Sequence, residues 1–386
     1  LAPGLVDAHV HIESSMLSPA EFGRQAVRHG TVATVSDPHE IANVLGIDGV
    51  QWMLESAAAS PCNIFFGVPS CVPATPFETA GANLEVNDMH ALFDEPRIVA
   101  LSEMMNFPGV LNNDPEVMAK IALARDRGYP IDGHAPGLRG DAVLRYAAAG
   151  INTDHECFTL EEAREKIAAG MVVQIREGSA ARNFDVLHPL ISEFPQQVML
   201  CSDDKHPDDL MAGHINRMAA RAVALGHNRL DVLRCASLNP IRHYHLPVGT
   251  LKVGENMDAV LFADLFGFES LQTLIAGVQV ACAGECLSAH TPATVLNRFQ
   301  AESLTAEELA VPSEDAVMIR VIEAVDGELV TGERHELPRI VDGLIEADPT
   351  RDLLQLVVLN RYQGGLPPAL AFVSGFGLQR GAIAST

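Results

Sequence analysis

The sequence predicts an α/β protein built on a (β/α)8 TIM-type barrel, with a small accompanying β domain and a partial α+β region near the C-terminal end. Two observations predict this fold. Short apolar runs rich in β-branched residues alternate with helix-like segments through the first two hundred residues. From His11, which ends the first run, to Asp203, which follows the eighth, each unit takes about 27 residues, the size of one strand–helix repeat.

Eight apolar runs are the expected barrel strands, and helix-like segments lie between them. The strands are expected at residues 4–12, 31–36, 63–68, 97–101, 129–133, 150–153, 171–175 and 198–201. The helices are expected at residues 19–29, 114–128, 139–149, 159–170 and 206–225. Thr159 and Glu162 have the spacing of a capping box, and Gly170 stands where a glycine would end that helix.

After Asn239 and Pro240 the alternation of strand-like and helix-like segments ends, and short strand-like runs separated by turn residues follow. We expect three regions: the barrel in residues 1–240, a small β-sandwich-like segment in 241–291, and an incomplete α+β region in 292–386. Within the last region a helix is expected at 305–310 and a strand at 316–323. Because the chain begins with Leu1 and ends without an obvious stop, we expect residues to be missing at both ends.

Composition narrows the function classes. Lys and Arg number 26 against 50 Asp and Glu, a net charge of −24 that repels phosphate backbones and anionic lipid. Nucleic acid and membranes are therefore not expected partners, and no apolar stretch approaches the ~20 residues of a membrane span. Seven scattered cysteines form neither a disulfide framework nor a zinc motif, which favours a reducing compartment. We expect a cytoplasmic globular protein.

The strongest local signal for chemistry lies at the end of the first strand. His9 and His11 are two residues apart, and side chains at that spacing in a strand point to the same face. Two imidazoles on one face at a barrel mouth are suitable metal ligands. The alternative for this motif alone is a pair of hydrogen-bonded histidines that line a polar barrel interior.

Further polar side chains follow the other strands, and all strand ends of a barrel surround one mouth. They are Asp37 and His39 after the second strand, Glu103 after the fourth, His134 after the fifth, His155 after the sixth and Asp203 after the eighth. With His9 and His11, the cluster is too large for one tetrahedral ion and suits two ions bridged by a carboxylate and a hydroxide. Without metal, such a buried cluster would leave polar groups unpaired. The sequence therefore predicts a binuclear metal site.

Several motifs give the chain a family resemblance that runs over essentially its whole length. Residues 3–11 (PGLVDAHVH), Asp203 and the Asn239–Pro240 pair resemble the amidohydrolase superfamily. More narrowly, the chain resembles the adenine deaminases of microbes, through residues 9–16 (HVHIESSM), 36–43 (SDPHEIAN), 102–109 (SEMMNFPG), 132–136 (DGHAP), 154–156 (DHE) and 201–206 (CSDDKH). Relatives of this kind begin some tens of residues earlier and continue well beyond Thr386.

The resemblance implies a metal pattern and a reaction. It places His9, His11, His134, His155 and Asp203 on two divalent ions, with Glu103 as the bridge where many relatives use a carboxylated lysine. Imidazole and carboxylate ligands suit manganese, iron or zinc, and the family favours manganese or iron. The implied reaction, part of purine salvage, is hydrolysis of the 6-amino group of adenine through a metal-bridged hydroxide, which gives hypoxanthine and ammonia.

Within that reaction Asp203 is the expected proton shuttle, and its neighbour Asp204 is not, because consecutive residues at a strand end point in different directions. A further set of residues near strand ends is expected to bind the purine or to lie behind the ligands: Glu13, His39, Glu40, Lys205 and His206. The alternatives are another binuclear amidohydrolase acting on a cyclic amide or a different aminopurine, and a truncated, metal-free scaffold. We expect a homo-oligomer, a dimer or larger.

Overall fold

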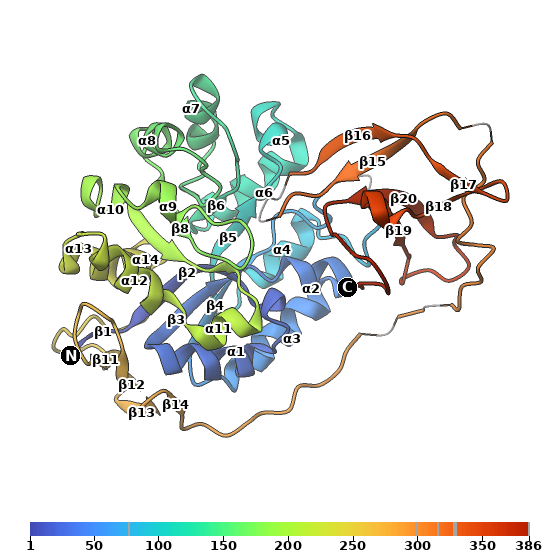
Figure 1. The fold of residues 1–386 in the computed structure, drawn as a ribbon. Helices are drawn as coiled ribbons and strands as arrows, with labels where there is room; N and C mark the ends of the chain where they lie inside the picture. Colours follow the sequence, from blue (N-terminus) through green and yellow to red (C-terminus); the bar gives the residue numbers. More distant parts are fainter. Residues whose placement is uncertain (76–77, 298, 301, 315, 327–329, 385–386) are drawn as a thin grey trace. The chain divides into compact units, whose positions relative to one another are not determined.

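Eight parallel strands in chain order, with helices between them, form the N-terminal part of the molecule (Figure 1). This computed structural model describes residues 1–75, 78–297, 299–300, 302–314, 316–326 and 330–384. Leu1–Val295 and Leu296–Thr386 are separate compact units. The barrel strands are β2 (Leu5–His11), β3 (Thr31–Ser36), β4 (Asn63–Val68), β5 (Ile98–Met104), β6 (Ile131–Gly133), β7 (Thr153–Asp154), β8 (Val172–Arg176) and β9 (Val198–Cys201).

Backbone pairing closes these strands into a barrel and confirms the predicted fold. Strands β2 to β6 pair side by side, and β7 to β9 form a second parallel set. Beyond β9, the short strand β10 (Asp203–Asp204) pairs in parallel with β2, with Asp203 opposite Val10. On the other side, Asn152 joins the two sets, since its backbone N–H donates to the carbonyl of Ile131 at 2.9 Å.

Four of the five helices expected from the sequence are present in the barrel unit, and further helices accompany them. Those expected are α1 (Pro19–Ala26, continued by a 3-10 turn at Val27–His29), α6 (Pro115–Asp126), α7 (Asp141–Ala148) and α8 (Leu160–Ala168). The others are α2 (His39–Leu45), α3 (Ile47–Ala58), α4 (Val86–Leu92), α5 (Phe107–Leu111), α9 (Phe184–Leu187), α10 (Leu190–Glu193), α13 (Arg229–Leu233), a π-helical turn (Arg234–Leu238) and α14 (Asn239–His243). No helix among the described residues has the length and apolarity needed to cross a bilayer.

Two details of the helix prediction are wrong for tertiary reasons. The single helix expected at 206–225 is broken into α11 (Pro207–Ala212) and α12 (Ile215–Ala224), because His214 turns into the core, where Nε2 lies 2.8 Å from Asp7 Oδ2. The capping box at α8 is half formed. Thr159 accepts the backbone N–H of Glu162 at 3.2 Å, but the Glu162 carboxylate accepts the N–H groups of Phe158 and Gly137 instead.

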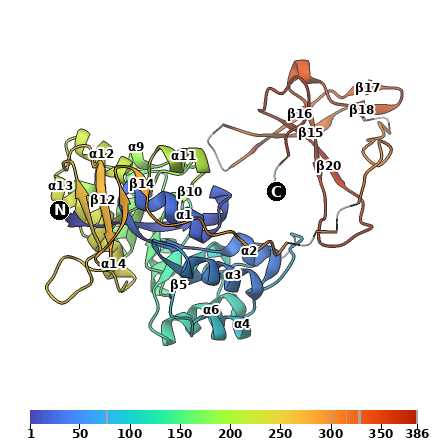
Figure 2. The ribbon, with the colours of Figure 1, turned by 90° about the horizontal axis from the view of Figure 1, so that it is seen from below.

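A small antiparallel sheet belongs to the same unit as the barrel (Figure 2). The start of the chain supplies one of its strands, β1 (Ala2–Pro3), which pairs with β11 (Ala259–Phe262). The remaining strands are β12 (Ser270–Ile275), β13 (Val278–Cys282) and β14 (Glu285–Cys286). The division at residues 240 and 291 expected from the sequence stays a prediction.

The C-terminal unit is built on a four-stranded sheet of order β16-β15-β20-β19 beside a β17-β18 hairpin. Its elements are β15 (Ile319–Glu323), β16 (Gly332–Glu336), β17 (Arg339–Val341), β18 (Leu344–Glu346), a 3-10 turn (Pro349–Arg351), β19 (Leu354–Val358) and β20 (Ala369–Ser374). Residues 306–309 form turns rather than the helix expected at 305–310. The buried core of this unit is small and centres on Val321 and Phe372.

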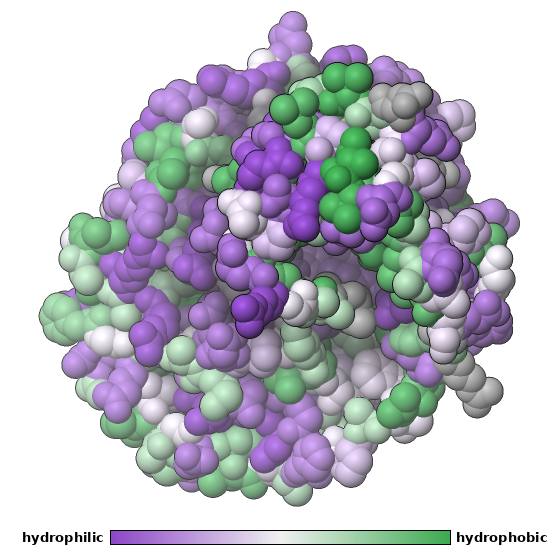
Figure 3. Space-filling view, turned by 45° about the vertical axis from the view of Figure 1, so that its right-hand side comes forward, coloured by the Kyte–Doolittle hydropathy of each residue, from purple (hydrophilic) through white to green (hydrophobic). Residues whose placement is uncertain are grey.

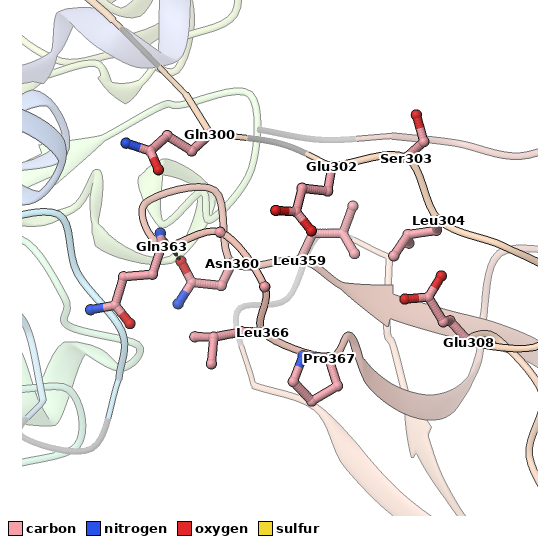
Figure 4. Close-up of a pocket in the computed structure, with 12 residues that line it drawn as sticks. Gln300, Glu302, Ser303, Leu304, Glu308, Leu359, Asn360, Gln363, Leu366 and Pro367 are labelled. Atoms are coloured by element: carbon pink, nitrogen blue, oxygen red, sulfur yellow. Dashed lines mark hydrogen bonds between the residues drawn. The ribbon is translucent and has the colours of Figure 1, made fainter.

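A cavity of about 260 Å³ lies within the C-terminal unit (Figure 4). Amide and carboxylate side chains such as Gln300, Glu302 and Glu308 line it together with the turn at 359–367. In that turn Asn360 Oδ1 accepts the backbone N–H of Gln363 at 3.0 Å. The described residues of its lining include no histidine or cysteine, so it does not resemble the metal site predicted from the sequence. The face of the molecule in Figure 3 is mostly hydrophilic with scattered hydrophobic patches, as expected for so acidic a chain.

Closure of the barrel between β6 and β7 depends on Gly133. A Cβ atom at this position would lie 2.3 Å from the carbonyl oxygen of Thr153 and 2.6 Å from Ile151 Cγ2. We predict that Gly133→Ala forces the two strands apart and lowers the free energy of unfolding by about 1–3 kcal/mol. Urea unfolding followed by the fluorescence of Trp52, the single tryptophan and part of α3, measures this. Gly267→Ala is the control, because its nearest atom would be 3.8 Å away. Equal unfolding midpoints for the two variants would contradict the prediction.

Candidate metal centre

Strand β2 carries the first two predicted ligands. His9 and His11 lie on the same face of the strand, and their Nε2 atoms are 3.1 Å apart. Both rings are buried, with 1% and 4% of their surface exposed. The alternation of a strand therefore aims two imidazole nitrogens at one point inside the barrel mouth.

Glu103 lies between these two histidines and two others. It is inside β5, which continues past the predicted end of the apolar run at Leu101. Its Oε2 is 2.6 Å from His134 Nδ1 and 3.1 Å from His155 Nε2, and its Oε1 is 3.4 Å from His11 Nε2. The carboxylate thus has one oxygen toward each group of histidines, the arrangement that a bridging ligand needs.

Asp203 faces the same point from β10. Its Oδ1 lies 3.5 Å from Nε2 of both His9 and His11 and 3.7 Å from His155 Nε2. The backbone at Asp203 has a φ of +53°, in the left-handed region that few residues other than glycine adopt. Asp204 Oδ1 accepts the hydroxyl of Ser14 at 2.5 Å, and its carboxylate groups with His11 and Glu40 rather than with His9 and His155. The two consecutive carboxylates therefore diverge as the strand register predicts.

The residues expected to bind the purine or to lie behind the ligands fall into two groups: some lie at the ligand cluster, and the others make contacts elsewhere. His39 and Glu40 join the cluster, with His39 Nδ1 3.4 Å from Glu103 Oε1 and Glu40 Oε1 3.2 Å from His11 Nδ1. Glu13 accepts the backbone N–H of Ile41 at 3.2 Å, and burial together with the charge of Glu40 raises its pKa to about 8. Lys205 Nζ instead donates to the carbonyl of Glu177 at 3.3 Å.

The last of these residues, His206, precedes α11, and its backbone N–H donates to Ser179 Oγ at 2.8 Å. His206 does not belong to any of the candidate ligand groups found among the described residues.

Three charged residues at the site were not in the predicted ligand set. Asp37 Oδ2 is 3.0 Å from His39 Nδ1. Glu156 Oε1 is 3.4 Å from His155 Nε2, and Arg176 holds both Glu156 oxygens and lies 3.1 Å from Asp203 Oδ2. Arg176 ends β8, the seventh barrel strand, so the strand-end rule that found the other residues also points to it.

The carboxylates and imidazoles of the cluster stabilise one another's charged forms. Burial opposes ionisation of Glu103, but His134 and His155 hold the pKa of its carboxyl well below the usual range. Hydrogen bonds with His11 and His9 likewise outweigh burial and keep the pKa of Asp203 low. Burial would lower the pKa of His134, but the Glu103 carboxylate raises it to about 9. The site therefore favours positive charge at its centre.

The residues present fit two divalent cations. If the imidazoles are neutral, six carboxylates face one guanidinium, which leaves five negative charges for cations to balance. These charged residues are Asp37, Glu40, Glu103, Glu156, Asp203 and Asp204, with Arg176. Although Nε2 of buried His155 lies 3.1 Å from Glu103 Oε2, neither of its ring nitrogens has a partner in hydrogen-bond geometry among the described residues, so Nε2 is available to a metal. In each candidate ligand group the ligand atoms lie within 4.8 Å of one another, and imidazoles and carboxylates supply all of them.

Comparison with known sequences identifies the family. The chain belongs to the amidohydrolase family, metal-dependent hydrolases whose family model matches residues 1–280. A second model, the adenine deaminase C-terminal domain, matches residues 328–386.

The curated relatives of the chain are adenine deaminases. That of Salinibacter ruber is 53% identical over 386 residues, which cover all of this chain and 71% of the relative. That of Methanosarcina mazei is 49% identical over 398 residues, which cover all of this chain and 72% of the relative. That of Borreliella afzelii is 42% identical over 393 residues, with 100% and 71% covered. Within the amidohydrolases the chain therefore groups with the adenine deaminases.

Solved structures of more distant proteins share the barrel. The β-aspartyl dipeptidase of Fervidobacterium islandicum superimposes with a TM-score of 0.56 at 16% identity, covering 75% of this chain and 86% of that one. The D-hydantoinase of a Thermus species gives a TM-score of 0.54 at 14% identity, covering 74% and 86%. At these identities the likeness supports the fold alone.

Glu103 is predicted to be essential for metal loading. Glu103→Gln keeps the size of the side chain but removes the charge that lies between the two groups of histidines. Metal content after equilibration with manganese and gel filtration should fall from about two equivalents to one or fewer. Elemental analysis measures it, and Glu55→Gln, an exposed carboxylate on α3, should leave the content unchanged. Full metal content in Glu103→Gln would remove it from the ligand set.

His134 and His155 should belong to the same ion. His134→Ala and His155→Ala should each lower the bound metal by one equivalent and leave the other ion in place, because each removes a ligand of the same ion. The fold should persist, because the apolar strands rather than these imidazoles form the barrel core. Circular dichroism checks that the fold persists. The control is His188→Ala, because the ring of His188 contacts His227 rather than the ligand cluster. Two equivalents in both variants would contradict a shared site.

Proposed function

We propose that the chain catalyses the hydrolysis of the 6-amino group of adenine to give hypoxanthine and ammonia. The observation that carries this proposal is the 53% identity to an adenine deaminase over the full length of the chain. The adenine deaminase C-terminal domain match at 328–386 agrees with it. The clustering of His9, His11, Glu103, His134, His155 and Asp203 in one barrel mouth supports a binuclear hydrolytic centre.

Two divalent ions held by these residues would lower the pKa of water so that a hydroxide nucleophile exists near neutral pH. Manganese and iron are our first candidates, and zinc fits the same donor set. His9, His11 and Asp203 would hold one ion, and His134 and His155 the other. Glu103, with one oxygen toward each group, would link them. The two ions and Arg176 would then balance most of the charge of the six carboxylates without protonated histidines.

Asp203 is our candidate to move protons. Its Oδ1 faces the three histidines, while Arg176 holds Oδ2 at 3.1 Å and fixes the plane of the carboxylate. Attack of water on the amine-bearing carbon of adenine releases one proton, and the departing amine must gain one. A carboxylate that accepts this proton and donates it to the amine nitrogen would let ammonia leave, and the remaining hydroxyl proton moves to ring nitrogen N1 as the carbonyl of hypoxanthine forms.

His39, Glu40 and Glu13 are the candidates to contact the purine. His39 and Glu40 begin α2 and face His11 and Glu103, so a planar ring above the ligand cluster would meet them. One oxygen of Glu13 and one of Glu40 are buried without a hydrogen-bond partner among the described residues. Such oxygens are available to the nitrogen-bound hydrogens of a purine.

The experiment that tests the proposal measures ammonia release from four compounds by the manganese-loaded protein. Adenine should be the preferred substrate, and adenosine, guanine and hydantoin should react far more slowly. Adenosine distinguishes a free-base pocket from one that admits a sugar. Faster turnover of hydantoin would instead indicate hydrolysis of a cyclic amide, and no turnover of any compound would contradict the proposal.

Asp203 and Asp204 should differ sharply in their effect on turnover. Asp203→Asn removes the proton-accepting charge and should lower kcat for adenine by about 10²–10⁴-fold, the usual contribution of a positioned general base. Asp204→Asn is the matched comparison: its carboxylate accepts the Ser14 hydroxyl and lies beside His11 and Glu40 rather than His9 and His155, so its loss should matter much less. If Asp204→Asn were the inactive variant, the roles assigned to the two residues would be reversed.

A further inference from the structure

The two halves of the metal centre are supported by two different clusters of buried polar side chains. One half consists of His134 and His155, and the other of His9, His11 and Asp203. Behind each half, a charged side chain deeper in the protein reaches the backbone that carries the ligands. Neither supporting cluster belongs to the predicted ligand set.

Lys166 is the centre of the first cluster. It lies on α8 and is completely buried. Its Nζ is 3.0 Å from Asp154 Oδ2, donates to Glu162 Oε1 at 2.7 Å and donates to the carbonyl of Ala135 at 2.8 Å. An ammonium group has three protons, so each has an acceptor and none is left for solvent.

The two carboxylates around Lys166 hold the loops that follow β6 and β7. Asp154 accepts the backbone N–H of Ala135 at 3.0 Å through Oδ2 and that of Glu156 at 2.8 Å through Oδ1. Glu162 accepts the N–H groups of Gly137 at 2.9 Å and Phe158 at 3.1 Å. Because Ala135 follows His134 and Glu156 follows His155, the cluster fixes both histidines relative to each other.

The second cluster is centred on Asp7 and supports the other half. Asp7 Oδ1 accepts the backbone N–H of Ser202 at 2.9 Å, and Oδ2 lies 2.8 Å from His214 Nε2. Thr31 Oγ1 is 2.7 Å from the other ring nitrogen of His214. Asp7 comes two residues before His9, and Ser202 directly precedes Asp203. Among the described residues, no hydrogen bond joins a side chain of this cluster to Lys166, Asp154 or Glu162.

We infer that Lys166 is a positioning residue for the His134–His155 half of the centre, and that this half can be weakened without disturbing the His9–His11–Asp203 half. The inference rests on the binuclear site proposed above. Without the ammonium, two buried carboxylates face each other and the carbonyl of Ala135 loses its donor. The loops then lose the geometry that holds two imidazoles on one ion. Groups behind metal ligands commonly contribute about 10–100-fold to metal affinity.

The test is a manganese titration of chelator-treated protein, followed by isothermal calorimetry and carried out without adenine. Wild type should show two binding steps, and His134→Ala identifies which step belongs to the His134–His155 half. Lys166→Met keeps the aliphatic stem and should weaken that same step by about 10–100-fold, leaving the other unchanged. His214→Ala should weaken the opposite step.

The control for general destabilisation is Ile167→Ala, the next residue on α8. Ile167 is 4% exposed, so its truncation weakens the packing of α8 and should lower the unfolding midpoint while leaving the polar cluster in place. Both binding steps of Ile167→Ala should match wild type. If Lys166→Met does not fold, Glu162→Gln, which removes one charge of the cluster, should weaken the same step to a smaller extent.

Three results would overturn the inference: a single binding step in wild type, equal weakening of both steps in the folded Lys166 or Glu162 variant, or the same selective loss in Ile167→Ala. Failure of the proposed reaction is a separate outcome. A protein with two binding steps that does not deaminate adenine would contradict the proposed function and leave the role of Lys166 intact.

Discussion

Negative charge concentrated at one mouth of the barrel is the constraint on which the rest of the structure depends. Six carboxylates meet there, and Glu103, Asp203 and Glu156 are almost completely removed from water. Buried charge of one sign is tolerated only where it is compensated, and one guanidinium does not suffice. The histidines arranged around Glu103 and Asp203, together with the cations they are suited to hold, supply the remainder. At this mouth, stable folding and metal binding therefore both require positive charge to balance the carboxylates.

The barrel meets this requirement by separating two tasks. Apolar residues of the strands and helices supply the burial that stabilises the fold. Polar residues directly behind the ligands, such as Asp7 and Lys166, determine where each ligand stands. A hydrophobic core tolerates exchanges of similar volume, whereas a buried ammonium with three acceptors does not. The positions of the ligands are therefore more sensitive to sequence than the barrel itself.

The fold, and the meeting of the predicted ligands at one mouth, could be read from the sequence because both follow from regular strand geometry. The strand period aims His9 and His11 together, and the convergence of strand ends brings Glu103, His134, His155 and Asp203 to the same mouth. Arg176 did not enter the predicted set, because a charged residue after an apolar run also suits a solvated strand end. The break between α11 and α12 was unpredictable for another reason. It depends on Asp7, some two hundred residues away in sequence, which draws His214 inward.

The pairing of β10 with β2 has a consequence for how the protein assembles. Asp203 meets Val10 only after the chain has travelled round all the other strands, so this contact is the seam of the barrel. An ion shared by His9, His11 and Asp203 would bind residues on both strands of this closing pair. Its binding energy would favour the closed barrel over any state in which the last strand has separated. Chelation would then be expected to release the barrel first at this seam.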